Sequence, residues 1–381
     1  MPEAFIVDAV RSPVGRRKGG LAGVHPDLAA HVLLALVDRT GIDPGLIEDV
    51  YFGCVDQIGP QTGNIARIAW LNAGLPEHVP GTTIDRQCGS SQQALHFAAQ
   101  AVMSGTADLI VAGGVESMNQ VPIMSPATIA AEKGMTLPYD GQGWHSHYGD
   151  QEVSQFRGAE LIAEKWDISR RDMEEYALRS HQRATAAWDA RHFDAEVAPG
   201  FGVSVDEGPR SDTTLEKMSQ LAPLREDGRL TAALSSQIAD GSAALLVASE
   251  SALKLHGLTP LARVHTMAVV GSDPIYMLTG PIPATDKVLA KSGLSLADID
   301  LFEVNEAFAS VVLAWAKETG APLDKTNTLG GAIALGHPLG ATGTRLMTSL
   351  VHQLQRTGKR YGLQTMCEGG GMANATIIER V

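Results

Sequence analysis

The hydrophobic residues of the chain fall into short runs that end at glycine or at a charged residue, with stretches of helical periodicity between them. The runs predict buried strands at residues 4–10, 50–55, 109–114, 243–249, 261–271, 301–305, 363–367 and 375–381. The periodic stretches predict helices at residues 28–39, 92–105, 155–166, 170–190 and 343–358. Strands that alternate with helices in this way are typical of an α/β protein.

A middle segment, residues 119–238, has a different texture. It is rich in proline, glycine and mixed charge, and it holds two of the helical stretches but no run comparable to the buried strands. We interpret it as an insertion or cap between two α/β units.

The two α/β units have the same order of features, which indicates a weak internal repeat. In the first, Cys88 precedes a helix and the strand at 109–114, and in the second, His337 precedes a helix and the strand at 363–367. The two residues therefore occupy corresponding turns, which a pseudo-twofold axis would bring together at the helix ends. Coincidence is the alternative, since α/β proteins often repeat such strings.

The charge argues against nucleic-acid binding. The 381 residues include 30 Lys plus Arg and 43 Asp plus Glu, a formal net charge of −13. A phosphorylated ligand would need a local basic patch, because the long-range field opposes an anion. No later run approaches the roughly 18 uncharged apolar residues of a membrane span, and Glu3, Asp8 and Arg11 interrupt the first apolar stretch. The sequence predicts a cytoplasmic protein without a membrane span.

The only cysteines, Cys54, Cys88 and Cys367, are odd in number and far apart, so reduced thiols are expected and a disulfide framework is not. No metal site is predicted, because there is no Cys-x-x-Cys pair and the neighbouring His145 and His147 have no cysteine or second close pair beside them. Cys54 lies within an apolar run and is interpreted as a buried residue.

Two turns hold candidate catalytic groups. Cys88 precedes small residues at the start of a predicted helix, where the helix dipole favours a thiolate; a small buried residue is the alternative. His337 lies among five glycines in residues 330–343, which suits a tight turn that holds an imidazole against a ligand. A flexible surface loop is the alternative here, and a phosphate-binding loop is excluded because no lysine follows.

Two strand ends add further candidates. Cys367 ends a predicted strand before the glycines 369–371, whose N–H groups can point at a developing oxyanion, although a plain exit from the strand would look the same. Asn305 and Glu306 end another strand, and capping of the next helix by Asn305 is the alternative to a catalytic role.

Together these strings resemble the signatures of the thiolase family. The match comprises a C-x-S segment at Cys88, an N-E-A-F box at Asn305, the glycine-histidine box around His337 and a C-x-G-G-G box at Cys367, all in family order. The resemblance covers essentially the whole chain. It implies a duplicated α-β-α-β-α layered fold with an inserted loop domain. The implied boundaries are 1–118 plus 239–261 for the N-terminal domain, 119–238 for the loop domain and 262–381 for the C-terminal domain.

The resemblance also implies a reaction. This is the cleavage of a 3-ketoacyl-CoA by coenzyme A to acetyl-CoA or propionyl-CoA and a shortened acyl-CoA, as in lipid β-oxidation. Cys88 matches the nucleophile that becomes acylated, and His337 matches the group that activates it and that forms an oxyanion site with a water held by Asn305. Cys367 matches the general acid/base, and the N–H groups of Cys88 and Gly369 match a second oxyanion hole. Coenzyme A is implied as a substrate, with no tightly bound cofactor.

Coenzyme A contacts follow more loosely from the resemblance. His147 and Tyr148 match loop-domain residues that pack on the pantetheine arm, and Ser236 matches a serine on the same arm. Arg210 matches an arginine near the adenine and phosphate end, where Lys217 could add charge. Ala307 and Phe308 could line the pantetheine tunnel, although Phe308 could also be a core residue. Each of the polar contacts could equally be an exposed loop residue.

The chain departs from the family pattern at Asp85, where asparagine is common, at the residues after Cys88, and at Glu368, where a small or aliphatic residue is usual. A carboxylate near Cys367 disfavours its thiolate. A branched or polycyclic acyl chain is one expectation for the substrate. The alternatives are formation of acetoacetyl-CoA from two acetyl-CoA, a ketosynthase-like enzyme, which the second cysteine disfavours, and a non-catalytic acyl-CoA-binding protein. Family likeness implies a homodimer or homotetramer.

Overall fold

The strands of the computed structural model, which describes residues 2–24 and 27–381, form one mixed sheet. Along it the described strands follow the order β4-β3-β5-β6-β1-β7-β10-β9-β8, and β2 pairs with β6 beside this path. The strands are β1 (Ala4–Arg11), β2 (Gly15–Arg16), β3 (Asp49–Gly53), β4 (Thr82–Ile84), β5 (Leu109–Ser117), β6 (Ala239–Ser249), β7 (Ala262–Gly271), β8 (Leu301–Val304), β9 (Tyr361–Glu368) and β10 (Met372–Arg380).

The helices cover both faces of this sheet and fill the space between its halves. They are α1 (Asp27–Thr40), α2 (Ile65–Asn72), α3 (Ser90–Ser104), α4 (Ser125–Glu132), α5 (Gln142–Tyr148), α6 (Gln155–Lys165), α7 (Arg170–Asp189), α8 (Leu215–Ser219), α9 (Glu250–His256), α10 (Pro281–Ser292), α11 (Ala309–Thr319), α12 (Ala332–Leu335) and α13 (Thr342–Thr357). None of the helices in the described ranges is long and apolar enough to cross a membrane.

The sheet confirms the duplication that the order of sequence features predicts. In the first half, β3 is parallel to β5, and β5, β6 and β1 then pair antiparallel. In the second half, β8 is parallel to β9, and β9, β10 and β7 pair antiparallel in the same way. The halves meet where β1 pairs with β7 at Phe5–Arg263 and Ile6–Ala262. Each half thus carries its turn and helix at the same place.

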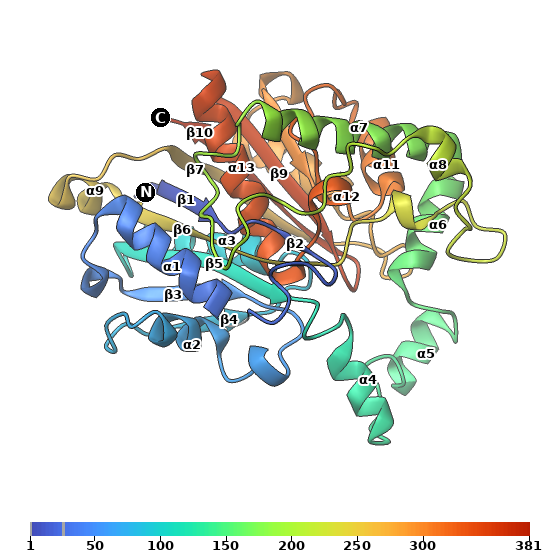
Figure 1. Ribbon diagram of the computed structural model, residues 1–381, viewed down its shortest axis with the longest axis horizontal. Helices are drawn as coiled ribbons and strands as arrows, with labels where there is room; N and C mark the ends of the chain where they lie inside the picture. The colour runs from blue at the N-terminus through green and yellow to red at the C-terminus, as the bar shows by residue number, and fades with distance from the viewer. Residues whose placement is uncertain (1, 25–26) are drawn as a thin grey trace.

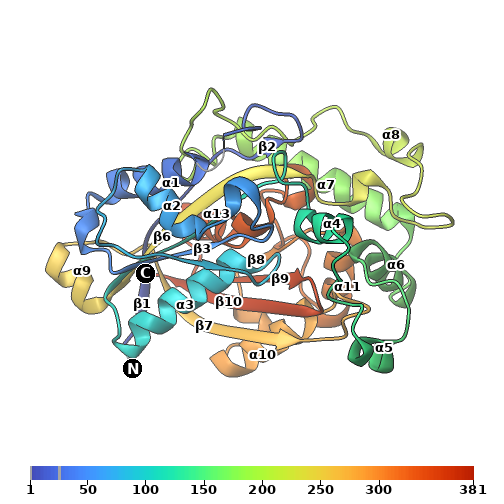
Figure 2. The ribbon, with the colours of Figure 1, turned by 90° about the horizontal axis from the view of Figure 1, so that it is seen from below.

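The layers follow from which helix contacts which half of the sheet. Helices α1, α2 and α9 contact strands of the first half, and α10 contacts β7, β9 and β10 of the second half. Helices α3 and α13 contact each other, and α13 also touches strands of both halves, so this pair forms the central layer (Figures 1 and 2). The α-β-α-β-α layering is therefore as predicted.

Glycines let the two central helices approach at their N-terminal ends. A Cβ on Gly343 would lie 2.3 Å from the backbone nitrogen of Gln92, and a Cβ on Gly114 would lie 2.2 Å from the carbonyl oxygen of Gly340. Real side chains do not fit at such distances. Glycine is therefore required at positions 114 and 343 by the close packing between the two halves.

The insertion, residues 119–238, contains no strand of the sheet, as the sequence predicts. Its helices α6 and α7 pack on α11, where Ile162 and Tyr176 join the same apolar core as Trp315. Helices α4 and α5 instead form an arm that extends from the body in Figure 1. One part of the insertion is thus built into the core, and the other is exposed.

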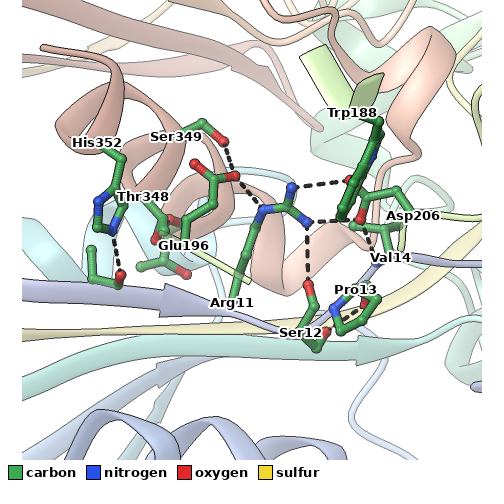
Figure 3. Close-up of polar contacts among 12 residues, drawn as sticks. Arg11, Ser12, Pro13, Val14, Trp188, Glu196, Asp206, Thr348, Ser349 and His352 are labelled. Carbon is green, nitrogen blue, oxygen red and sulfur yellow. Dashed lines mark hydrogen bonds and ion pairs between the residues drawn. The ribbon is translucent and has the colours of Figure 1, made fainter. Parts of the chain in front are cut away.

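A buried ion-pair network attaches the loop after α7, within the insertion, to β1 and α13 (Figure 3). Arg11 Nε, on β1, donates to Glu196 at 2.6 Å, and its Nη1 and Nη2 donate to Asp206 at 2.7 and 3.0 Å. Ser349 on α13 donates to Glu196 at 2.9 Å, and Trp188 Nε1 donates to Asp206 at 3.1 Å. Because the charges of this network are buried, the two carboxylates depend on Arg11 for their compensation.

Candidate active site

Cys88 lies in the tight turn that joins β4 to α3. The turn is shaped by Asp85, whose carboxylate accepts the N–H of Gln87 at 2.7 Å, and Gln87 has a left-handed φ of 50°. Ser90 then donates to the carbonyl of Gln87 at 2.6 Å and accepts the N–H of Arg86 at 2.9 Å. These bonds place Cys88, partly buried, directly before the first turn of a fifteen-residue helix.

Two backbone groups favour a negative charge on the Cys88 sulfur, namely its own N–H and that of Gly369. Burial and the neighbouring Glu368 carboxylate act the other way and are stronger, so the pKa of the Cys88 thiol is raised to about 12. Cys367 is fully buried on β9, and burial followed by the nearness of Cys88 raises its pKa well above the ordinary range. Both cysteines are therefore neutral thiols at rest, and they lie close to one another.

His337 is held in one tautomer by the turn before α13. Thr342 Oγ1 donates to the carbonyl of Pro338 at 2.8 Å, so at 2.6 Å from the ring it can only accept from His337 Nδ1. Nδ1 therefore carries the proton, and the lone pair of Nε2 accepts from Asn305 Nδ2 at 3.4 Å. Burial and then Arg345 lower the pKa of His337 to about 3, so the ring is neutral.

Asn305 lies where β8 ends and is 1% exposed. Within the described part of the chain its Oδ1 has no hydrogen-bond partner, which leaves one acceptor available beside the His337 ring. Among the described residues, no hydrogen bond joins Cys88 to His337. The packing of α3 on α13 brings their two turns into one region.

The sequence marks Glu306 only as a carboxylate at a strand end and gives it no role. In the structure this carboxylate joins the N-E-A-F box to the glycine-histidine box. It accepts from Tyr176 at 2.8 Å and from Ser180 at 2.7 Å on α7, and from the backbone N–H of Ile333 at 3.0 Å. Asn327 donates to it at 3.1 Å. The glutamate of the N-E-A-F box therefore ties the insertion to the segment that leads into His337.

Glu116 does the corresponding work in the first half and was not predicted either. Its buried carboxylate accepts the backbone N–H groups of Val55 at 2.9 Å and Gly340 at 2.8 Å, and Gln61 donates to it at 2.8 Å. Gly340 follows His337 by three residues. Cys54 is fully buried beside Glu116, as predicted for a residue in an apolar run.

A largely apolar cavity of about 110 Å³ reaches His337. Two of the residues predicted to contact coenzyme A, Ser236 and Phe308, line it. Ser236 is positioned by its N–H, which donates to the carbonyl of Ala307 at 2.9 Å, and Phe156 meets Phe308 edge to face with 5.7 Å between ring centroids. The other residues of the lining are Met118, Ile123, Gln155, Ser235, Gln237, Ile238 and Leu339.

The remaining predicted contacts lie outside this cavity. His147 and Tyr148 are exposed on α5, where His147 Nδ1 bonds to the carbonyl of Gly143 at 2.8 Å. Arg210 is exposed before α8, and its backbone N–H donates to His181 at 3.2 Å. Lys217 is exposed and paired with Asp212 at 2.7 Å. The structure thus brings Ser236 and Phe308 to His337 but leaves these four residues on the surface.

Comparison with known families accounts for nearly the whole chain. The model of the thiolase N-terminal domain matches residues 4–251, and that of the thiolase C-terminal domain matches residues 258–380. The chain belongs to the thiolase family. It is an acyltransferase, and the resemblance on the four sequence strings is confirmed.

Relatives of this thiolase match it from end to end. A steroid 3-ketoacyl-CoA thiolase of Mycobacterium tuberculosis is 59% identical over 100% of this chain and 95% of that protein. The 3-oxoadipyl-CoA/3-oxo-5,6-dehydrosuberyl-CoA thiolase of Escherichia coli K12 is 43% identical over 100% of both chains. These relatives confirm a thiolase function and agree with the predicted degradative direction.

Solved structures agree in fold. The human mitochondrial 3-ketoacyl-CoA thiolase in complex with CoA superposes with a TM-score of 0.90 at 38% identity, covering 100% of this thiolase and 98% of that chain. The acetyl-CoA acetyltransferase of Bacillus anthracis superposes with a TM-score of 0.89 at 37% identity, covering 100% and 99%. The duplicated layered fold is confirmed.

Proposed function

We propose that this thiolase cleaves a 3-ketoacyl-CoA with a bulky acyl chain, through an acyl intermediate on Cys88. One observation carries the proposal: the thiols of Cys88 and Cys367 are neighbours, and the turn that holds His337, which lines an apolar cavity, packs on the start of α3, the helix that Cys88 precedes. The set contains a soft nucleophile, a proton acceptor and a weak acid, and the cleavage of a carbon–carbon bond beside a thioester requires all three.

In the first half-reaction, the Cys88 thiol attacks the 3-keto carbon as its proton passes to Nε2 of His337. Because the pKa of the Cys88 thiol is about 12 and that of His337 about 3, a preformed thiolate–imidazolium pair is not the resting state. Proton transfer is therefore coupled to attack. The bond between carbons 2 and 3 then breaks, and Cys367 protonates the departing carbanion. Acetyl-CoA leaves, and the shortened acyl group remains bonded to Cys88.

In the second half-reaction, the Cys367 thiolate takes the proton from the thiol of an incoming coenzyme A. The coenzyme A sulfur attacks the acyl carbon, and the Cys88 sulfur leaves and regains its proton from His337. The products are a shortened acyl-CoA and the enzyme in its starting state. After the first half-reaction the Cys88 proton is on His337 and Cys367 is a thiolate. The second half-reaction restores both groups, so the protons balance over the full cycle.

Two groups of donors stabilise the oxygen that becomes negative in these steps. The N–H groups of Cys88 and Gly369 already act on the Cys88 sulfur, so they also reach a carbonyl bonded to that sulfur. On the other side, the Asn305 amide beside His337, with its free Oδ1, would hold a water toward the enolate oxygen of the second thioester. We assign the two oxyanion sites to these groups.

Coenzyme A enters as a substrate, and its pantetheine arm occupies the cavity lined by Ser236 and Phe308. The human relative that superposes on this chain was solved in complex with CoA, which supports this placement. His147, Tyr148 and Arg210 are proposed to contact the outer part of the molecule, and they would have to do so from the exposed arm and the loop before α8.

The acyl group is proposed to be polycyclic, because the relative that is 59% identical over the full chain is named a steroid 3-ketoacyl-CoA thiolase. We further propose, on family likeness, that the protein assembles as a homodimer or homotetramer. We propose that it works in the cytoplasm because the sequence has no membrane-span-like run and its three cysteines suit reduced thiols. Light scattering that gave a monomeric mass would contradict the assembly.

The first test is intact-mass spectrometry after mixing with acetoacetyl-CoA. We expect one acetyl adduct that free coenzyme A discharges and that Cys88→Ala abolishes. The acyl group is then tested by comparing kcat/KM for a steroid-side-chain 3-ketoacyl-CoA with that for acetoacetyl-CoA, where we expect a preference of at least roughly tenfold. Synthesis of acetoacetyl-CoA that outpaced cleavage would favour the biosynthetic alternative, and binding without an adduct from either substrate would favour the non-catalytic one.

A further inference from the structure

Glu368 is a buried acid for which the steps above have no use. It follows Cys367 at the end of β9 and is 0% exposed. No side chain among the described residues donates to either carboxylate oxygen, and the backbone N–H of Asn374 is the weakest of the influences on it. A Cβ on Gly89 would lie 2.1 Å from Glu368 Oε1 and 2.6 Å from Asn374 Oδ1, so both oxygens lie against the same point. Glu368 therefore packs on the residue that follows Cys88, at the start of α3.

Asn374 shows where a proton is needed. Its Nδ2 donates to the carbonyl of Gly89 at 3.4 Å, which fixes the orientation of the amide, and its Oδ1 has no donor. The two oxygens of Glu368 and the Oδ1 of Asn374 are thus buried acceptors without a donor among them. A proton on Glu368 turns one acceptor into a donor and gives Asn374 its partner.

The charges around Glu368 do not compensate an ionised carboxylate. The groups that face it are Arg86 and Cys88 from the turn before α3 and Cys367 from β9, while β10 contributes the neutral Asn374. Arg86 lowers the pKa of Glu368, as does the backbone N–H of Asn374, but burial is the larger effect and raises that pKa to about 8. No ion pair of the described residues involves Glu368.

We propose that Glu368 is a positioning residue that works as a neutral carboxylic acid, donating to Asn374 to hold the Gly89 turn, and that its ionisation suppresses Cys88 by placing a negative charge beside the thiol. The inference rests on the proposed role of Cys88 as the nucleophile. A like charge disfavours thiolate formation, so the enzyme carries a brake that engages as the pH rises. Glu368 acts through Cys88 and does not touch the substrate.

The test follows the rate at which iodoacetamide alkylates Cys88, located by peptide mass, from about pH 6 to about pH 10 in the wild type and in Glu368→Gln. Glutamine has the shape of the neutral acid and can donate to Asn374. We expect equal rates below about pH 7, and a wild-type rate that falls roughly tenfold behind the variant well above pH 8. The ratio of kcat/KM should follow the same curve, because groups common to both proteins cancel.

Two further variants separate charge from structure. Glu368→Ile removes the charge but cannot donate, so it should also lose the alkaline brake while leaving Asn374 unpaired. The matched control is Glu250→Gln on the exposed face of α9, which should follow the wild type at every pH. Burial also raises the pKa of Glu303 to about 8, so the infrared measurement is a difference between the wild type and Glu368→Gln. This difference should show a protonated carboxyl band that titrates near pH 8.

A ratio that is constant across the pH range, or a wild type without that band at neutral pH, would overturn the proposal. Either Glu368→Gln or Glu368→Ile can serve as the reference for the infrared difference, so the measurement decides even where one of the two variants fails to fold. The alkylation assay does not depend on turnover. Absence of an acyl adduct on Cys88 would therefore refute the proposed function without changing the outcome for Glu368.

Discussion

The tautomer of His337 depends on one hydroxyl group, so Thr342→Val tests the proposed chemistry most directly. Valine has the same shape but cannot accept the Nδ1 proton that Thr342 now accepts at 2.6 Å, nor donate to Pro338 at 2.8 Å. Both groups are buried, and a buried polar group left unpaired costs about 1–3 kcal/mol. If that loss is felt when His337 must take the Cys88 proton, kcat/KM falls by about 5- to 150-fold, since 1.36 kcal/mol is a factor of ten.

The assay is thiolysis of acetoacetyl-CoA, with the rate of Cys88 acylation followed separately by intact mass. We expect slower acylation, an unchanged KM for coenzyme A and a lowered free energy of unfolding. Thr342→Ser keeps the hydroxyl and is the matched control, with activity close to that of the wild type. The reasoning fails if the valine variant stays within about twofold of the wild type, or if serine is as slow as valine.

Three other changes have defined outcomes. Arg11→Leu strands two buried carboxylates and should lower the free energy of unfolding by about 3–5 kcal/mol in urea, whereas Arg171→Leu, in an exposed helical pair, should change it by less than about 1 kcal/mol. Gly343→Ala should lower the free energy of unfolding by about 1–3 kcal/mol and slow Cys88 acylation, because its Cβ would lie 2.3 Å from a backbone nitrogen of α3. The control, Gly141→Ala, meets nothing within 4 Å and should be neutral. Equal effects of the two changes would contradict the packing argument. The pKa of Glu368 is raised from its ordinary value of 4.5 to about 8, so between these pH values the group is protonated in the folded protein and ionised in the unfolded one. As the pH rises through this window, the free energy of unfolding of the wild type should fall relative to that of Glu368→Gln, by up to about 5 kcal/mol. Parallel curves of stability against pH would refute this.

The layers of the fold could be predicted because periodicity and glycine placement are local signals. The helices predicted at 92–105 and 343–358 are observed as Ser90–Ser104 and Thr342–Thr357. The strand predicted from 243 begins at Ala239, since Asp240 and the residues after it are buried against neighbouring strands although they read as a turn. The pattern gave no prediction for α10, which packs on β7, β9 and β10. It expected a helix after Asn305, which is observed as α11 on α6 and α7, but its N-cap is Phe308 and not Asn305.

The candidate site residues could be predicted only where the local sequence around a single residue is unusual. Cys88 stands out by the small residues that follow it and His337 by its glycine-rich surroundings, and the structure packs their two helices together. The hydrogen bonds of Glu116 and Glu306 come from elements far apart in the chain, so no local pattern contains them. Thr342 lies within the glycine-histidine box, residues 330–343, but its role follows only from its distances to His337 and Pro338.

The junction between the two halves has a consequence for the history of the chain. In the proposed reaction centre, the first half supplies the thiol of Cys88 and the second supplies His337, Asn305 and Cys367, so neither half alone would hold all of its groups. A half-length ancestor with one such unit would have needed a second copy of itself, joined about a twofold axis, to place two turns face to face. Fusion of the two genes would then have freed each turn to specialise, one for the nucleophile and the other for the base. The glycines at the contact would have served such a pairing in the same way, because they let the two halves pack more closely than any side chain would allow.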